Sequence, residues 1–329
     1  MKLLTVSIAG YNVAAFIRQT LDSLCCKNME RLEIFVVDDG GSDATLQIAQ
    51  DYAKRYPDSI IPVHKDNGGW GSTVNYSIKH ASGKYFKLLD GDDHFDTANL
   101  DLLLDYLEHA DTDVIYTPYR LFDDKTGSQV EISDITKDFD TFKAYNLSEL
   151  NVREGVEMHA LTFKTSILQN NNVQVTEKCF YTDNEYRTKG LAFSSTIVFT
   201  DFLLYHYRVG REGQSIDVAG MRKHYKDSIM VARELIEFHK KSNTSLPPCV
   251  EYCVENAISF TYLMLILIKE REGLRKFDEY VKNQGAYYYR SPIKNVNLLR
   301  RMNFHCLIII SLMTKLRISL NPIIKKIRK

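Results

Sequence analysis

Hydrophobic and polar positions along the first 120 residues alternate between two patterns. Short, nearly continuous apolar runs predict buried strands, and the segments between them have the three- and four-residue apolar spacing of amphipathic helices. Strands are predicted at 3–9, 32–39, 60–64, 84–90 and 113–119, and helices at about 13–25, 43–56, 72–82 and 99–110. Strands that alternate with helices of this length predict a mostly parallel α/β sheet with helices on both faces.

After about residue 120 the pattern changes. Further strands are predicted at 157–164, 195–201 and 202–209, with a helix at 182–192 whose N-cap is Thr182 or Asp183. The later residues have helical spacing that breaks at the prolines 247–248. We therefore predict an α/β domain at 1–215, a helical extension at 216–283 and a basic amphipathic tail at 284–329.

A cluster of acidic residues follows one predicted strand. The strand at 84–90 runs into Asp90, Asp92 and Asp93, and like charges this close repel each other, so folding alone would not select them. A solvated turn that caps the next helix accounts for such residues. A divalent cation also accounts for them, because Mg²⁺ and Mn²⁺ prefer hard oxygen ligands. The position beyond a buried strand, where ligands bind in such sheets, favours the cation.

Polar loops follow the neighbouring strands at the same edge. Asp39 can accept a hydrogen bond from a base or a ribose, while residues 42–43 can simply cap the next helix. The turn at Gly68 and Gly69 opens a helix, where backbone N–H groups can face a phosphate. Trp70 can stack on a sugar or a base, or anchor the loop. We therefore expect the polar loops to converge on one ligand-binding edge.

Four motifs, in this order and at this spacing, carry a family resemblance: TVSIAGYNVAAFIRQTLDSL, LEIFVVDDGGSDAT, NGGWGSTVNYSIKHASGKYFKLLDGDD and FYTDNEYRTKGL. Over roughly residues 3–210 the chain resembles a family 2 glycosyltransferase of the GT-A fold. The resemblance implies a Rossmann-like sheet, a nucleotide-sugar donor, a bound Mn²⁺ or Mg²⁺ and inversion at the anomeric carbon. It also implies a nucleotide-sugar-binding part at about 1–120 and an acceptor side at about 120–215.

The resemblance assigns roles to individual residues. Tyr11 and Asp39 are expected to contact the nucleotide base. Asp90, Asp92 and Asp93 match the region that binds the metal and the diphosphate, with Asp92 as the direct metal ligand. The remaining expected contacts to the donor are Gly68, Gly69, Asn75, Arg208 and Arg211.

Two further segments carry expected chemistry. Asp183 matches the catalytic base of inverting members, with Glu185 as a weaker candidate and a plain helix cap as the alternative for Asp183. His206, Arg208 and Arg211 lie in YHYRVGREGQSID and are expected to close over the diphosphate as a flexible lid. Arginine suits that role because it donates bidentate hydrogen bonds to phosphate. An exposed loop with solvated arginines is the alternative.

The distribution of charge singles out the C-terminal part. The chain has 42 basic and 42 acidic residues, but eleven basic ones and no acidic one follow Glu279, so residues 1–281 carry a net charge of −11 and the rest +11. The apolar core of 304–329 is too short for a transmembrane helix and predicts an interfacial helix on an anionic membrane surface. A basic helix packed on the domain is the alternative, and no nucleic-acid-binding module is recognised upstream.

The N-terminus and the cysteines indicate the compartment. Residues 1–12 contain one lysine and a strand-like run, so no signal peptide is expected. The six cysteines form no CxxC pair and are expected to be reduced thiols, and a zinc site at Cys249 and Cys253 has little support. We therefore expect a cytoplasmic protein that is peripheral on the inner face of the cell membrane.

Two classes of function compete. The leading hypothesis is an inverting transfer of a sugar from a nucleotide donor, UDP-sugar by preference, to a glycan or lipid-linked acceptor in surface polysaccharide synthesis. The alternative is a catalytically silent module of the same fold that recruits partner transferases, and the acids at Asp39, Asp92 and Asp183 argue against it. A nucleotidyltransferase should carry a basic residue in a glycine-rich N-terminal loop, which SIAGYNVAAF lacks.

Overall fold

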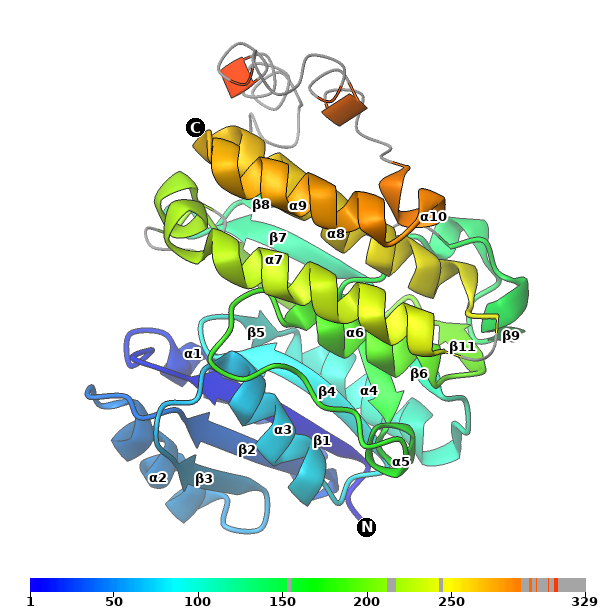
Figure 1. The fold of residues 1–329 in the computed structure, drawn as a ribbon. Helices are drawn as coiled ribbons and strands as arrows, with labels where there is room; N and C mark the ends of the chain where they lie inside the picture. The colour runs from blue at the N-terminus through cyan, green and yellow to red at the C-terminus, as the bar shows by residue number, and fades with distance from the viewer. Residues whose placement is uncertain are drawn as a thin grey trace.

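An eight-stranded sheet forms the centre of the molecule (Figure 1). The computed structural model describes residues 1–152, 155–211, 217–242, 245–290, 296–297, 300, 307 and 311–312. The strand order is β3 (Ile60–His64), β2 (Leu32–Asp38), β1 (Leu4–Gly10), β4 (Tyr85–Asp90), β10 (Leu161–Lys164), β6 (Val114–Tyr116), β11 (Thr196–Phe199) and β9 (Ala144–Asn146).

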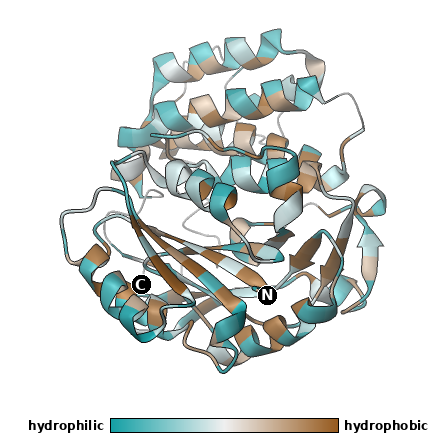
Figure 2. Cartoon of the chain, turned by 90° about the horizontal axis from the view of Figure 1, so that it is seen from below, coloured by the Kyte–Doolittle hydropathy of each residue, from teal (hydrophilic) through white to brown (hydrophobic). Residues whose placement is uncertain are grey.

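Most of the predicted parallel arrangement is confirmed. β1 runs parallel to both β2 and β4, β2 to β3, and β6 to β11. β10 is antiparallel to β4 and β6, and β9 to β11. The apolar runs of β1, β2 and β4 are almost completely buried, and Figure 2 shows hydrophobic residues along the sheet and hydrophilic ones on the outer helices.

Six helices accompany the sheet: α1 (Ile17–Asp22), α2 (Thr45–Arg55), α3 (Trp70–His80), α4 (Thr97–His109), α5 (Thr165–Asn170) and α6 (Asp183–Ala192). The helix expected at 13–25 is shorter at both ends: residues 14–16 form a turn, and the helix runs only from Ile17 to Asp22. The predicted N-cap of α6 is confirmed at Thr182.

A second sheet lies beside the carboxyl end of β4. Its order is β5 (His94–Phe95), β12 (Tyr205–Val209), β7 (Tyr119–Asp123) and β8 (Gln129–Ser133). β12 corresponds to the later part of the strand predicted at 202–209 and pairs antiparallel with β5, so that His206 lies opposite His94. This pairing brings the second sheet against the acidic turn that follows β4.

The predicted helical extension consists of α7 (Val218–Lys241), α8 (Pro248–Ile268), α9 (Arg271–Asn283) and the short α10 (Ala286–Tyr289). α8 begins at Pro248 and so confirms the expected break. In the described part of the chain it is the one helix long and apolar enough to cross a membrane, a property shared by buried core helices, and 61% of its apolar window is buried. α8 packs against α6, α7 and α9. The tail predicted to bind membranes at 304–329 lies almost entirely outside the described residues.

Candidate active site

The acidic turn after β4 is held by the second sheet. Asp93 is buried, with its Oδ1 accepting from the Arg208 N–H at 2.7 Å and its Oδ2 from the Tyr205 hydroxyl at 2.7 Å. The Asp90 N–H donates to the same hydroxyl at 3.1 Å, and Asp90 Oδ1 accepts from Trp70 Nε1 at 2.9 Å. Trp70 is therefore an anchor of the turn, and the two carboxyl groups are fixed beside each other.

The electrostatic strain predicted from the sequence is present in the fold. Burial, together with the charges of Asp92 and Asp183, raises the pKa of the Asp90 carboxyl to about 7. Burial also raises the pKa of Asp93 well above its usual range, again with the charge of Asp92 acting in the same direction. Protons or a cation must therefore neutralise this turn.

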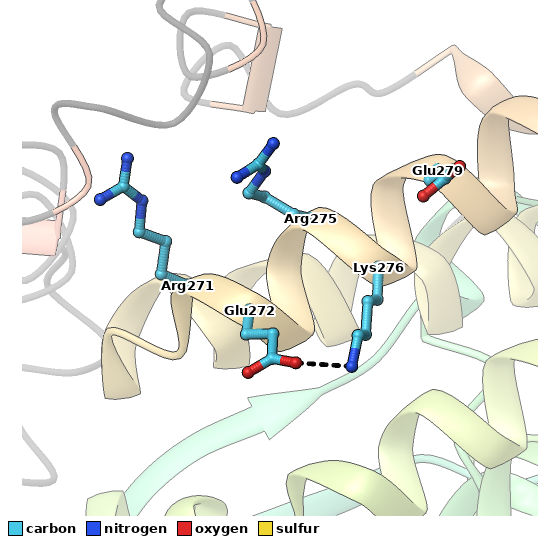
Figure 3. A pocket seen from close by; sticks show the side chains of 5 residues that line it. All are labelled: Arg271, Glu272, Arg275, Lys276 and Glu279. Atoms are coloured by element: carbon cyan, nitrogen blue, oxygen red, sulfur yellow. Dashed lines mark hydrogen bonds and ion pairs between the residues drawn. The ribbon is translucent and has the colours of Figure 1, made fainter.

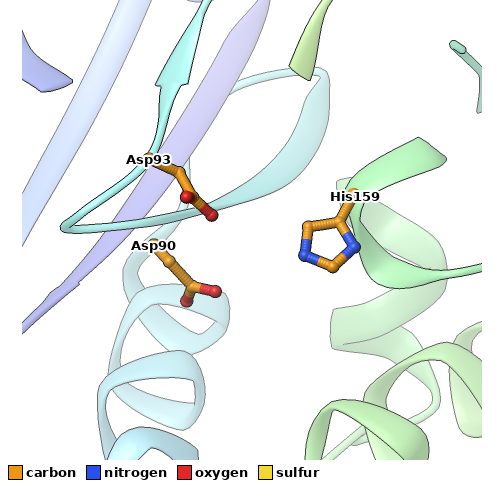
Figure 4. A group of neighbouring side chains, drawn as sticks. All are labelled: Asp90, Asp93 and His159. Carbon is orange, nitrogen blue, oxygen red and sulfur yellow. The ribbon is translucent and has the colours of Figure 1, made fainter. Parts of the chain in front are cut away.

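A histidine that sequence reasoning missed completes the cluster. Ligand atoms of Asp90, Asp93 and His159 all lie within 4.8 Å of one another (Figure 4). Burial lowers the pKa of His159 to about 3, helped by the charges of Lys87 and Arg187, so its imidazole is neutral. Within the described residues, His159 Nδ1 has no hydrogen-bond partner. The two carboxylates suit Mn²⁺ or Mg²⁺, whereas an imidazole nitrogen is a ligand that transition metals prefer, so the whole donor set fits Mn²⁺ better than Mg²⁺.

Asp92, the predicted direct ligand, has a different partner. Its Oδ2 lies 2.8 Å from the Arg211 guanidinium, and Arg211 also lies over the ring of Phe16. The role of Asp92 as a metal ligand stays a prediction. The expected contact of Arg211 with the diphosphate also stays a prediction.

Arg208 corrects the expectation of a flexible lid. It lies inside β12 and is buried, and its guanidinium donates to the Asp124 carboxylate at 2.7 Å and to Gln19 Oε1 at 2.6 Å. His206 lies in the same strand and bonds to His94 at 2.9 Å. Because ladder pairing with β5 and β7 fixes this backbone, both residues belong to the rigid wall behind the acidic turn.

The glycine-rich turn also differs from expectation. The N–H groups of Gly68 and Gly69 donate to the Asp39 carboxylate at 2.9 and 2.7 Å, and Lys65 Nζ donates to it at 2.8 Å. Since these N–H groups donate hydrogen bonds to a buried carboxylate, the expectation that they face a phosphate is wrong for this conformation. Contacts of Asp39 with a base, and of the exposed Tyr11, stay predictions.

Asp183 is the first residue of α6 and is partly exposed. Burial raises its pKa above the ordinary value, with the charge of Arg187 opposing and that of Glu157 adding to the shift. Its charge also acts on Asp90, so the fold brings it near the acidic turn. The other candidate base, Glu185, is fully buried and bonds Lys189 Nζ at 2.9 Å.

Surface hollows occur away from this site, on the helical extension. One lies on the outer face of α9, where Glu272 and Lys276 form an ion pair at 2.6 Å (Figure 3). Another lies at the start of α7 and includes Arg222 and Lys223. Neither hollow is lined by the polar residues that follow the strands of the large sheet, so the acidic turn is the candidate site.

The chain resembles known proteins in sequence and in fold. A sequence profile described as glycosyl transferase family 2 matches residues 5–170. An uncharacterized glycosyltransferase of Rickettsia felis is 37% identical over 129 residues, which are 38% of this chain and 21% of that protein. The minor teichoic acid biosynthesis protein GgaB of Bacillus subtilis is 24% identical over 271 residues, 77% of this chain and 28% of GgaB. The chain thus matches about a fifth to two fifths of the length of such curated relatives.

Solved structures agree on the fold. S. aureus TarS 1–349 in complex with UDP-GlcNAc superposes with a TM-score of 0.67 at 18% identity, covering 95% of this chain and 89% of that one. The mannosyltransferase PcManGT from Pyrobaculum calidifontis, in complex with GDP-Man and Mn²⁺, gives a TM-score of 0.54 at 15% identity, covering 98% of this chain and 86% of that one. At such identities the likeness establishes the GT-A architecture.

Proposed function

This chain belongs to glycosyl transferase family 2, and we propose that it moves a sugar from a UDP-sugar to a hydroxyl of a glycan or lipid-linked acceptor with inversion. The observation that carries the proposal is the cluster of Asp90, Asp93 and His159 at the carboxyl end of β4, and the charge of Asp183, the first residue of α6, acts on the Asp90 of that cluster. A base and a leaving-group site on the two sides of a sugar are what inversion requires.

Asp183 is the base in this proposal. It is the first residue of α6 and is partly exposed, and burial of its carboxyl group raises the pKa above the ordinary value. A carboxylate with a raised pKa accepts a proton from a hydroxyl more readily. The charge of Arg187, one turn further along α6, opposes that rise in the pKa of Asp183.

Asp90, Asp93 and His159 are the proposed metal-binding residues, with Asp92 as a further predicted ligand. When bound, Mn²⁺ or Mg²⁺ supplies charge neutralisation for the diphosphate leaving group. Arg211 lies beside Asp92, and in this proposal it donates to the same diphosphate.

The name of GgaB and the UDP-GlcNAc complex of TarS support a UDP-sugar and an acceptor in surface polysaccharide synthesis. We also propose that residues 1–215 form the catalytic domain and 216–283 its helical extension. Residues 284–329 would hold the protein on the inner face of the cell membrane.

A panel of UDP-, GDP- and dTDP-sugars tests the proposal. We expect release of nucleoside diphosphate from one donor class, dependent on Mn²⁺ or Mg²⁺ and lost in Asp183→Asn. UDP binding without turnover of any donor would contradict the proposal and favour the alternative, a silent module that recruits partner transferases.

A further inference from the structure

Residues 174–178, which we call the bridge loop, pass between α3 and α6. On the α3 side, Asn75 Oδ1 accepts from the Val175 N–H at 2.9 Å, and Asn75 Nδ2 donates to the Val175 carbonyl at 2.9 Å. The same nitrogen donates to Glu177 Oε1 at 3.0 Å. One amide side chain therefore pairs with both backbone groups of a residue 100 positions away.

On the α6 side the bridge loop is held by a buried ion pair. Glu185 Oε2 accepts from the Thr176 N–H at 3.0 Å and from Lys189 Nζ at 2.9 Å. Lys189 Nζ also donates to the Gln174 carbonyl at 2.9 Å. Since Glu185 and Lys189 are on α6 itself, the loop and the helix that begins with Asp183 form one connected unit.

The bridge loop lies directly on the first turn of α3. A Cβ at Gly71 would overlap the Thr176 carbonyl oxygen, and one at Gly69 would lie 3.1 Å from the Lys178 nitrogen. The Lys178 N–H donates to the Gly68 carbonyl. Backbone packed this closely leaves no room for the loop to shift along the helix.

We propose that Asn75 and Glu185 are positioning residues, which fix Asp183 relative to the glycine turn and acidic turn through the bridge loop. The inference rests on the proposed function, in which Asp183 is the base. It gives both residues a positioning role. The sequence had indicated a contact to the donor for Asn75 and a second candidate base for Glu185. The carboxylate of Asp183 must meet the acceptor hydroxyl within a narrow geometry, so a loose bridge loop slows transfer without weakening donor binding.

Asn75→Ala tests the proposal, with Gln169→Ala as the matched control. Gln169 Nε2 on α5 donates to the Ile78 and Ala81 carbonyls at the far end of α3, at 2.9 and 3.0 Å, so its loss removes similar bonds from the same helix. The measurements are hydrogen exchange of residues 174–186, UDP affinity by calorimetry with Mn²⁺, and the kcat of UDP-sugar hydrolysis.

For Asn75→Ala we expect faster exchange in 174–186, UDP affinity within about twofold of wild type, and a kcat lower by about ten- to a hundredfold. Gln169→Ala should leave all three readouts at wild-type values. Glu185→Gln, which keeps the shape of the side chain, should behave like Asn75→Ala and retain the wild-type pH profile, because Glu185 takes no proton from the acceptor.

The outcomes separate the inference from the proposed function. Unchanged hydrogen exchange in both Asn75→Ala and Glu185→Gln overturns the proposal that these residues hold the bridge loop. A loss of UDP affinity with unchanged kcat in Asn75→Ala also overturns it, because Asn75 would then contact the donor. If the wild type turns over no donor at all, the proposed function fails, while the exchange measurement still decides whether Asn75 holds the bridge loop.

Discussion

Replacing Tyr205 by phenylalanine tests how the acidic turn is held. Tyr205 is fully buried, and its hydroxyl donates to Asp93 at 2.7 Å and accepts from the Asp90 N–H at 3.1 Å. Phenylalanine keeps the ring that packs edge-on against Phe95 and His159. The substitution therefore removes two hydrogen bonds and leaves the packing in place.

The expected magnitude follows from these two bonds. A hydrogen bond contributes about 1 kcal/mol net, and a buried N–H left without an acceptor costs about 1–3 kcal/mol. We therefore expect Tyr205→Phe to lower the free energy of unfolding by about 3 kcal/mol. Urea unfolding followed by circular dichroism, with EDTA to exclude bound metal, measures the difference.

Tyr186→Phe is the matched control. Tyr186 is equally buried and packs against Phe163, but its hydroxyl has no hydrogen-bond partner in the described part of the chain. Removing an unpaired buried hydroxyl should leave stability unchanged or raise it. An equal loss in both variants, or a loss under about 0.5 kcal/mol in Tyr205→Phe, would refute the reasoning.

The remaining predictions concern chemistry, metal and membrane. Asp183→Asn should bind UDP normally but transfer sugar about a hundred- to ten-thousandfold more slowly. Because the pKa of Asp183 is raised, its base form is lost as the pH falls through that raised value. The acid limb of the wild-type pH–rate profile should therefore lie above the range of an ordinary aspartate. An acid limb within the ordinary range counts against Asp183 as the base. His159→Ala and Asp92→Asn should each reduce the Mn²⁺-dependent thermal shift without unfolding the apo-protein, and an unchanged shift removes that residue from the ligand set. Deleting residues 304–329 should release the protein from anionic vesicles at low salt and spare donor hydrolysis; full-length protein that stays in the supernatant contradicts the membrane role.

The places of several candidate-site residues in the fold were predictable because their signal is local. Asp90, Asp92 and Asp93 end an apolar run, and Asp183 follows a recognisable cap, so each could be placed at a strand end or helix start from nearby residues alone. The carboxyl ends of parallel strands meet at one edge, which is why the loops after β2 and β4 converge as expected.

Other parts of the site depend on pairings across long stretches of chain. β10 runs antiparallel to β4 with Phe163 opposite Phe86, and the short 3-10 helix Met158–Ala160 just before β10 brings His159 close to Asp90. Nothing in the residues around His159 specifies that register, so the sequence indicated a strand there and no metal ligand. The shared hydroxyl of Tyr205 is equally remote, 112 residues from Asp93.

The amino-acid sequence by itself determined the α/β class and the family and indicated the acids of the candidate site, because apolar periodicity and motif order are properties of neighbouring residues. Only the tertiary structure decided what those acids contact. It paired Asp39 with the glycine turn and fixed Arg208 in a strand. It also joined Asn75 to the bridge loop. These outcomes follow from strand register and from the need of buried polar groups for partners, which are satisfied by whichever residues the fold brings near.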